Sequence, residues 1–198
     1  MKDLVIIDSG GANIASLVYA LERLGCAAHL SADPVEIRSA ARVILPGVGA
    51  AADAMARLRA HGLVDVIPRL TQPLLGICLG MQLLFESSEE GDTRCLGVFP
   101  GAVRRFAAAP GRPVPHMGWN SLHAVADVPL LAGIRDGDYA YFVHSFAAPV
   151  GEHTLARCAY GADFSAVVGR GNFMATQFHP ERSAAAGARI LANFLGLS

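Results

Sequence analysis

The first half of the chain alternates short, continuously apolar runs with segments whose composition favours helices. In chain order these are strand 4–7 and helix 14–24, strand 42–45 and helix 50–60, and strand 73–77 and helix 79–86. Runs that are apolar throughout are typical of strands buried on both faces, which parallel sheets covered by helices require. Repeated strand–helix units therefore predict an α/β fold with three layers and a mainly parallel sheet. Weaker signals predict a strand at 27–30, a short helix capped by Asp33, and a helical stretch at 63–70.

The second half changes character, because short β-like runs follow one another without helical segments between them. These runs cover residues 102–106, 121–125, 139–143, 154–160, 166–168 and 173–178. Short links between strands favour hairpins, so we expect antiparallel extensions of the sheet here. A final helix at 183–195 closes the chain. With no repeat, linker or low-complexity segment, residues 1–198 are expected to form one domain.

Charge and cysteine content exclude several classes of protein. Sixteen Lys+Arg against seventeen Asp+Glu give a formal net charge of −1, so nothing draws the chain as a whole to nucleic acid or an anionic membrane. The first apolar run is too short for a signal peptide, and no uncharged run is long enough to span a bilayer. The four cysteines fit neither a redox pair nor a zinc site. We expect a cytoplasmic protein with no metal and no cofactor.

The segment Gly76-Ile77-Cys78-Leu79-Gly80 has a cysteine between two glycines, at a predicted junction of strand and helix. Such a junction presents a nucleophile at a sharp turn. The N-terminus of a helix favours the reactive thiolate, and the N–H of Leu79 would point to where an oxyanion forms. The alternative is a buried core cysteine, since the surrounding run is apolar.

A cysteine nucleophile needs a base, and His179 stands out among the seven histidines. It closes a predicted strand and is followed by Pro180 and Glu181. Proline favours an extended chain, so residues 179 and 181 should project to the same side and Glu181 should orient the imidazole. The alternative is a strand-end histidine beside a surface glutamate. Similarly, the loop 46–49 follows a parallel strand, and its glycines suit either an oxyanion hole or a simple turn.

These three segments, in this order, resemble the class I glutamine amidotransferases, which implies a flavodoxin-like fold. The resemblance implies a catalytic triad of Cys78 as nucleophile, His179 as acid and base, and Glu181 as the residue that orients the histidine. It further implies an oxyanion hole and a set of glutamine contacts. The oxyanion residues are Leu79, Val48, Gly47 and Gly49, and the substrate residues are Gln82, Ser145 and Phe146.

Two further segments, 115–120 and 141–145, resemble the glutaminase subunits of imidazole glycerol phosphate synthases. In that family the chain hydrolyses glutamine, and ammonia passes to a (β/α)8-barrel cyclase subunit that makes imidazole glycerol phosphate and aminoimidazole carboxamide ribotide in histidine biosynthesis. The resemblance implies a heterodimer without nucleic acid or membrane. The high hydrophobic content, 53%, is consistent with a covered face. The expected interface residues are Asn13, Met117, Trp119, Asn120, Tyr141 and Arg182.

Three positions depart from the family pattern without touching the triad. Ala12 replaces a usual glycine, Phe146 a common tyrosine, and Arg182 a common lysine. The residues also leave two other functions open. One is the glutaminase of another pathway, such as anthranilate or pyridoxal phosphate synthesis, against which segment 116–120 argues. The other is a catalytically idle subunit that only regulates a synthase.

Overall fold

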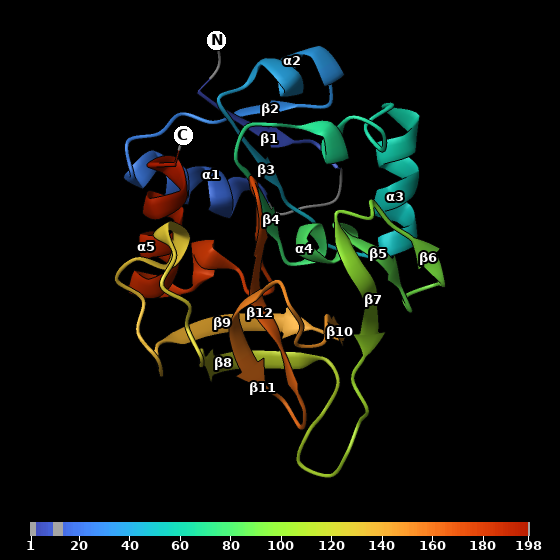
Figure 1. Cartoon of the computed structure of the whole chain (residues 1–198), viewed down its shortest axis with the longest axis vertical. Helices are drawn as coiled ribbons and strands as arrows, with labels where there is room; N and C mark the ends of the chain where they lie inside the picture. Colours follow the sequence, from blue (N-terminus) through green and yellow to red (C-terminus); the bar gives the residue numbers. More distant parts are fainter. Residues whose placement is uncertain (1–2, 10–13, 198) are drawn as a thin grey trace.

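The core of the protein is a mixed sheet (Figure 1). This computed structural model describes residues 3–9 and 14–197. The strand order of the sheet is β11-β12-β13-β4-β3-β1-β2. Five neighbouring strands are parallel, in the flavodoxin-like order β2-β1-β3-β4-β13. They are β1 (Leu4–Ile7), β2 (His29–Ser31), β3 (Arg42–Leu45), β4 (Leu74–Ile77) and β13 (Phe173–Thr176). The antiparallel strands β11 (Thr154–Ala159) and β12 (Asp163–Arg170) extend one edge, so the predicted mixed α/β sheet is confirmed.

Helices cover both faces of this sheet, which explains why its central strands are apolar throughout. Helices α1 (Ile14–Arg23) and α5 (Ala184–Leu195) pack on one face. On the other face lie α2 (Pro34–Ser39), α3 (Ala51–Ala60) and α4 (Leu79–Leu83). Figure 1 shows α1 and α5 on one side of the strands, with α3 and α4 on the other. The expected three layers are therefore present.

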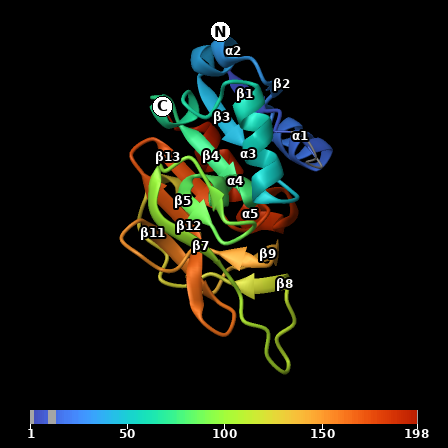
Figure 2. The same cartoon turned by 90° about the vertical axis from the view of Figure 1, so that its right-hand side faces the viewer.

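Two smaller sheets lie beyond the main one. The first has the order β10-β7-β5-β6, and the second pairs β8 with β9 in antiparallel register. Figure 2 shows β8 and β9 near one end of the molecule and α2 at the other. The strands are β5 (Phe85–Ser88), β6 (Thr93–Arg94), β7 (Phe99–Arg105), β8 (His116–Ser121), β9 (Tyr139–His144) and β10 (Phe146–Ala147).

Three sequence-based expectations were wrong in detail. The helix expected at 79–86 ends at Leu83, because Phe85 begins a strand that pairs with β7. The stretch 63–70 holds only the 3-10 turn Ile67–Arg69, where Pro68 lacks the N–H that a longer helix would use. The strand expected at 121–125 lies earlier, at His116–Ser121. Polar residues on its inner side hide the alternation that would have identified it.

The remaining regular elements are two 3-10 turns, Pro129–Leu131 and Pro180–Arg182. Three residues separate the second turn from the end of β13, and the turn leads into α5. Among the helices that the structure describes, none is long and apolar enough to cross a membrane.

Candidate active site

The carboxyl ends of three adjacent parallel strands bring the candidate residues together. Strands β3, β4 and β13 are neighbours, so the segments that follow them meet at one edge of the sheet. Residues 46–49 follow β3, Cys78 follows β4, and His179 comes shortly after β13. The backbone N–H of Cys78 donates to the carbonyl oxygen of Thr176 at 2.8 Å, which joins the ends of β4 and β13 directly.

Cys78 has a strained backbone at the start of α4. Its φ is 54° and its ψ is −110°, a region that residues other than glycine seldom adopt. Such strain costs about 1–3 kcal/mol and persists where the surrounding fold imposes it, as it commonly does at active sites. The expected sharp turn between strand and helix is present, and the unusual φ belongs to the cysteine itself. Leu79 is the first residue of α4, so its N–H has no acceptor within the helix.

The glycines around Cys78 serve close packing more than turning. A Cβ added to Gly80 would lie 1.9 Å from the carbonyl oxygen of Leu45, at the end of β3. A Cβ on Gly47 would lie 2.9 Å from the backbone nitrogen of Gly80. Loop 46–49 therefore lies directly against the first turn of α4, which brings its backbone close to Leu79.

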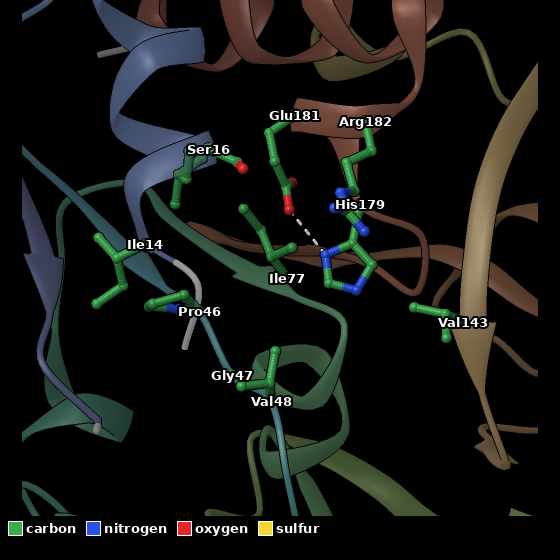
Figure 3. A pocket seen from close by; sticks show the side chains of 11 residues that line it. Ile14, Ser16, Pro46, Gly47, Val48, Ile77, Val143, His179, Glu181 and Arg182 are labelled. Atoms are coloured by element: carbon green, nitrogen blue, oxygen red, sulfur yellow. Dashed lines mark hydrogen bonds and ion pairs between the residues drawn. The ribbon is translucent and has the colours of Figure 1, made fainter. Parts of the chain in front are cut away.

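His179 and Glu181 form a buried pair. The Nδ1 of His179 lies 2.8 Å from Oε1 of Glu181, and their side chains are 11% and 8% exposed. Figure 3 shows this contact as a dashed line. The expected pairing is present, but the expected reason was wrong, because Pro180–Arg182 is a 3-10 turn and not an extended segment. The other carboxylate oxygen, Oε2, is buried and has no hydrogen-bond partner among the residues that the structure describes.

The charges around His179 favour its protonated form. Burial lowers the pKa of this imidazole, but the hydrogen bonds with Cys78 and Glu181 and the negative charges of both groups outweigh burial and raise the pKa to about 10. The same contacts place the imidazole next to the thiol of Cys78. An imidazolium beside a sulfur atom stabilises a thiolate, so the arrangement is suited to nucleophilic attack on a carbonyl carbon.

A cavity of about 310 Å³ opens over Cys78 and His179. The predicted substrate residue Gln82 lines it and donates through Nε2 to the carbonyl oxygen of Phe146 at 2.8 Å. The cavity therefore joins the thiol and the imidazole to most of the residues that the sequence singled out. Those residues are Val48, Gly49, Leu79, Gln82, Ser145 and Phe146.

Two residues of this site have no role assigned from the sequence. Gln177 is fully buried, and its Nε2 lies 3.8 Å from the Cys78 sulfur while its Oε1 accepts from Gln82 at 3.1 Å. The sequence feature that could have identified Gln177 is its position two residues before His179. Glu90 lines the cavity from the turn between β5 and β6, and it accepts from the N–H of Ala51 at 2.8 Å. No local pattern singles out Glu90, because only the tertiary fold brings this turn to the site.

A second, smaller cavity of about 140 Å³ lies beside the first, and Val48, Val143 and His179 line both. Figure 3 shows Glu181 and Ser16 at one end of it and Val48 at the other. Gly47 and Arg182 also line this second cavity. Loop 46–49 and His179 thus form the partition between the two spaces.

The residues expected at an interface fall into separate positions. Met117 and Trp119 project outward from β8 and are 67% and 52% exposed, and the ring of Trp119 contacts that of Tyr141 across the β8–β9 pair. Asn120 is half-buried and turns inward. Tyr139, which was not predicted, is 60% exposed on β9. Arg182 lines the smaller cavity, and Asn13 lies outside the described residues, as does Ala12.

The other cysteines differ from Cys78 in their surroundings. Cys95 and Cys158 are buried, which raises the pKa of their thiols to about 11 and about 12. Burial also raises the pKa of the half-buried Cys26. Thiols with raised pKa values are poor nucleophiles at neutral pH, so these three are packing residues.

Comparison with known proteins finds relatives along the whole chain. The family model of class I glutamine amidotransferases matches residues 5–196. A protein of Xanthomonas campestris described as imidazole glycerol phosphate synthase subunit HisH is 58% identical over 198 residues, covering 100% of this chain and 99% of the relative. A Xylella fastidiosa protein with the same description is 55% identical over 195 residues, covering 98% of each.

Solved structures share the fold at much lower sequence identity. A solved glutamine amidotransferase matches with a TM-score of 0.76 and 21% identity, covering 98% of this chain and 97% of the other. A glutamine amidotransferase from Thermotoga maritima matches with a TM-score of 0.65 and 18% identity, covering 94% and 79%. At such identities the likeness concerns the fold alone.

Proposed function

The chain belongs to the class I glutamine amidotransferase family, and from this premise we propose that it is the glutaminase subunit of an imidazole glycerol phosphate synthase. The observation that carries the chemistry is Cys78, held at positive φ beside the buried His179–Glu181 pair. The relatives that are 55–58% identical over the full chain support the assignment to this pathway. The chain hydrolyses glutamine to glutamate and ammonia, and ammonia is the nitrogen source for making imidazole glycerol phosphate.

In the proposed mechanism the Cys78 thiolate attacks the side-chain amide carbon of glutamine. The carbonyl π electrons move to oxygen, and backbone N–H groups of Leu79 and Val48 stabilise the oxyanion. The imidazolium of His179 gives its proton to the amide nitrogen, so the C–N bond breaks and ammonia leaves a thioester. Neutral His179 then takes a proton from water, and the hydroxide attacks the thioester and releases glutamate with the thiolate. Glu181 orients the imidazole and stabilises its charged form.

The cavity suits a small zwitterion such as glutamine. We propose that Gln82 and the backbone of Ser145 and Phe146 hold the substrate, since all three line the cavity beside Cys78. The carboxylate of Glu90 lines the same space and suits the α-ammonium group. Replacing Tyr by Phe at position 146 does not remove the contact with Gln82, because that contact uses the backbone carbonyl.

The function requires a second subunit, and we propose that it is a (β/α)8-barrel cyclase that forms a heterodimer with this chain. The exposed Met117 and Trp119 offer an apolar docking surface on β8, with Tyr139 beside them on β9. Val48 borders both cavities, so docking that shifts loop 46–49 would move an oxyanion-hole N–H into place. The isolated chain is therefore expected to have little glutaminase activity.

We further propose that the chain works as one domain in the cytoplasm. The family match supports one domain within residues 1–198, because a single family model spans residues 5–196. All four cysteines are free thiols, which supports a reducing compartment.

The decisive experiment measures glutamate release by the chain with its cyclase subunit and the ribulosyl-phosphate intermediate present. Activity that appears on addition of both partner and intermediate, and is lost in Cys78→Ala, supports the proposal. Activity restored by the partner of another glutamine-dependent pathway, and not by the cyclase, would contradict the pathway. A wild-type complex that makes product from added ammonia but never from glutamine would identify a catalytically idle subunit.

A further inference from the structure

Strand β8 has two faces with different chemistry. Met117 and Trp119 point outward and are exposed, whereas His116 points inward and is only 4% exposed. Asn120, on the inward side, lies with its Nδ2 3.3 Å from Nε2 of His116. His116 in turn meets His144 of β9, with 3.1 Å between Nδ1 of His116 and Nε2 of His144. Two histidines buried in contact have no role in the mechanism described above.

The contacts of His144 determine which of its nitrogens carries the proton. Its Nδ1 lies 2.8 Å from the carbonyl oxygen of Phe146, which can only accept, so Nδ1 is the donor. Burial lowers the pKa of His144 to about 3, which leaves the ring neutral at physiological pH. A neutral imidazole carries one proton, so Nε2 of His144 is an acceptor.

The same logic extends to His116 and Asn120. Because Nε2 of His144 accepts, Nδ1 of His116 must donate. Burial lowers the pKa of His116 to about 4, so its Nε2 accepts in turn, from the amide of Asn120. That amide is oriented by two further contacts, since its Nδ2 donates to Ala159 O at 2.9 Å and its Oδ1 accepts from Ser121 N at 2.8 Å. The donor direction therefore runs from Asn120 to Phe146.

At its other end this chain of hydrogen bonds reaches the nucleophile. The Phe146 carbonyl that accepts from His144 also accepts from Gln82 at 2.8 Å. Gln82 donates to Gln177 at 3.1 Å, and Gln177 lies 3.8 Å from the sulfur of Cys78. One carbonyl oxygen thus joins the histidine pair to the wall of the substrate cavity.

We propose that His116 and His144 are positioning residues of the glutaminase, which hold the Phe146 carbonyl where Gln82 needs it and are themselves set by Asn120 on the docking strand. The inference rests on the proposed function. Aromatic rings enclose both histidines, because His116 stacks on Tyr160 with 4.1 Å between centroids and Phe142 contacts both rings. Phenylalanine would fill such a space equally well, so the cost of burying two imidazoles points to their hydrogen bonds.

The first test compares His144→Phe with His144→Asn in the complex with the cyclase subunit. Phenylalanine keeps a ring but removes the donor to Phe146, whereas the Asn Nδ2 occupies the place of Nδ1 and keeps it. We expect the KM for glutamine to rise about tenfold in His144→Phe, as the loss of one hydrogen bond implies, with a smaller change in kcat. His144→Asn should restore most of the affinity. Equal KM values for both variants and wild type would overturn the proposal.

A second variant, Asn120→Asp, tests the proposal independently if His144→Phe does not fold. Asn120→Asp places an acceptor opposite Nε2 of His116, so this nitrogen becomes the donor and Nδ1 of His116 no longer donates to Nε2 of His144. Nitrogen-15 spectra of the full chain should show the proton on Nδ1 of both histidines in wild type, and on Nε2 of His116 in the variant. With the cyclase at saturation, the KM for glutamine should rise. A wild-type spectrum with the neutral tautomer protonated on Nε2 of His144 overturns the proposal. Wild type that never hydrolyses glutamine contradicts the proposed function instead.

Discussion

His179 and Glu181 are held together by local chain geometry. Their side chains meet at 2.8 Å although only Pro180 separates them, because His179 caps the start of the 3-10 turn Pro180–Arg182 that contains Glu181. The turn is anchored by the hydroxyl of Ser183, which donates to the carbonyl oxygen of His179 at 2.7 Å. Only Cys78 must be brought from elsewhere, and pairing of β4 with β13 does that. The contact between β4 and β13 therefore joins Cys78 to the His179–Glu181 pair.

Glu181→Gln should lower both the glutaminase activity and the fraction of His179 that is protonated. Removing the negative partner lowers the pKa of His179 from about 10 and leaves the imidazole less well oriented. We expect glutamate release by the complex to fall about 100-fold, the scale of general acid–base catalysis. Retention of wild-type kcat would contradict the role proposed for Glu181.

The same variant should change how the stability of the protein depends on pH above 6.5. A folded-state pKa of about 10, above the ordinary value of 6.5, gives stability that is complete below pH 6.5 and is lost as the pH rises towards 10. Thermal unfolding between pH 6.5 and 10 should therefore show a smaller fall in Tm for Glu181→Gln than for wild type. Parallel curves would show that the carboxylate does not raise the pKa of His179.

Cys78 should be the first thiol to react with iodoacetamide at neutral pH. It lines the cavity beside the His179 imidazole, whereas burial raises the pKa of the Cys95 and Cys158 thiols. Peptide mapping after brief labelling should find carbamidomethyl at Cys78, and Cys78→Ala should leave the chain unlabelled on that timescale. Because Cys78→Ala removes only one sulfur atom and leaves the backbone pairing of β4 unchanged, we expect its Tm to stay within about 2 °C of wild type. Earlier labelling of Cys95 or Cys158 would contradict the assignment.

Gly80→Ala should destabilise the fold because no space exists for the added methyl group. Its Cβ would lie 1.9 Å from the backbone oxygen of Leu45, which cannot move without breaking the β3–β4 pairing. We expect a loss of about 3 kcal/mol or more in the free energy of unfolding, measured with urea. The matched control is Gly151→Ala, where nothing lies within 4 Å and the change should be below about 1 kcal/mol. Equal stability of the two variants would contradict the close packing of α4 on β3.

The sequence predicted the parallel strands and the close approach of Cys78, His179 and Glu181 better than it predicted the walls of the cavity. Strand β4 and the Cys78 elbow are local patterns, so periodicity and glycine spacing found them. Strand β8 was missed because its inner residues are polar, and the hydrogen bonds that satisfy His116 come from β9 and from its own strand. Glu90 reaches the cavity only through the β5–β6 turn, a contact that no local pattern encodes.

The contact between His179 and Glu181 was predicted correctly, but for the wrong backbone conformation. Sequence reasoning placed His179 and Glu181 together by assuming an extended chain after Pro180, and the structure reaches the same contact through a 3-10 turn. Proline is compatible with both conformations at this position, because it suits the first residue of a helical turn as well as an extended segment. In the structure the N–H of Arg182 donates to the carbonyl oxygen of His179 at 3.0 Å, and α5 packs so closely on the turn that a Cβ on Gly187 would lie 1.9 Å from the Pro180 oxygen.

Trp119→Ala should weaken binding of the cyclase subunit without unfolding the chain. Its ring is 52% exposed on β8 and contacts Tyr141, so removing it takes apolar area from the proposed docking surface only. We expect the Kd to rise at least about tenfold by calorimetry, with little change in Tm. Val35→Ala is the control, since Val35 is 70% exposed on α2 at the opposite end of the molecule (Figure 2). Equal Kd values for the two variants would exclude Trp119 from the interface.

Acid should destabilise the protein through the buried histidine pair. The folded-state pKa values of His116 and His144, about 4 and about 3, lie below the ordinary value of 6.5. Between pH 6.5 and 4 the unfolded chain binds protons that the folded chain cannot bind. The pair's contribution to stability is therefore complete above pH 6.5 and is lost as the pH falls towards 4.

The matched variant for this effect is His116→Asn, which removes one titrating group and keeps a donor near the position of Nδ1. Its free energy of unfolding, measured with urea at intervals from pH 7 to 4.5, should fall less steeply than that of wild type. The difference between the two slopes isolates the proton that only the unfolded histidine binds, because every other carboxylate and histidine is common to both chains. Identical slopes would mean that His116 binds its proton equally well in the folded and unfolded chains, and burial would then not lower its pKa.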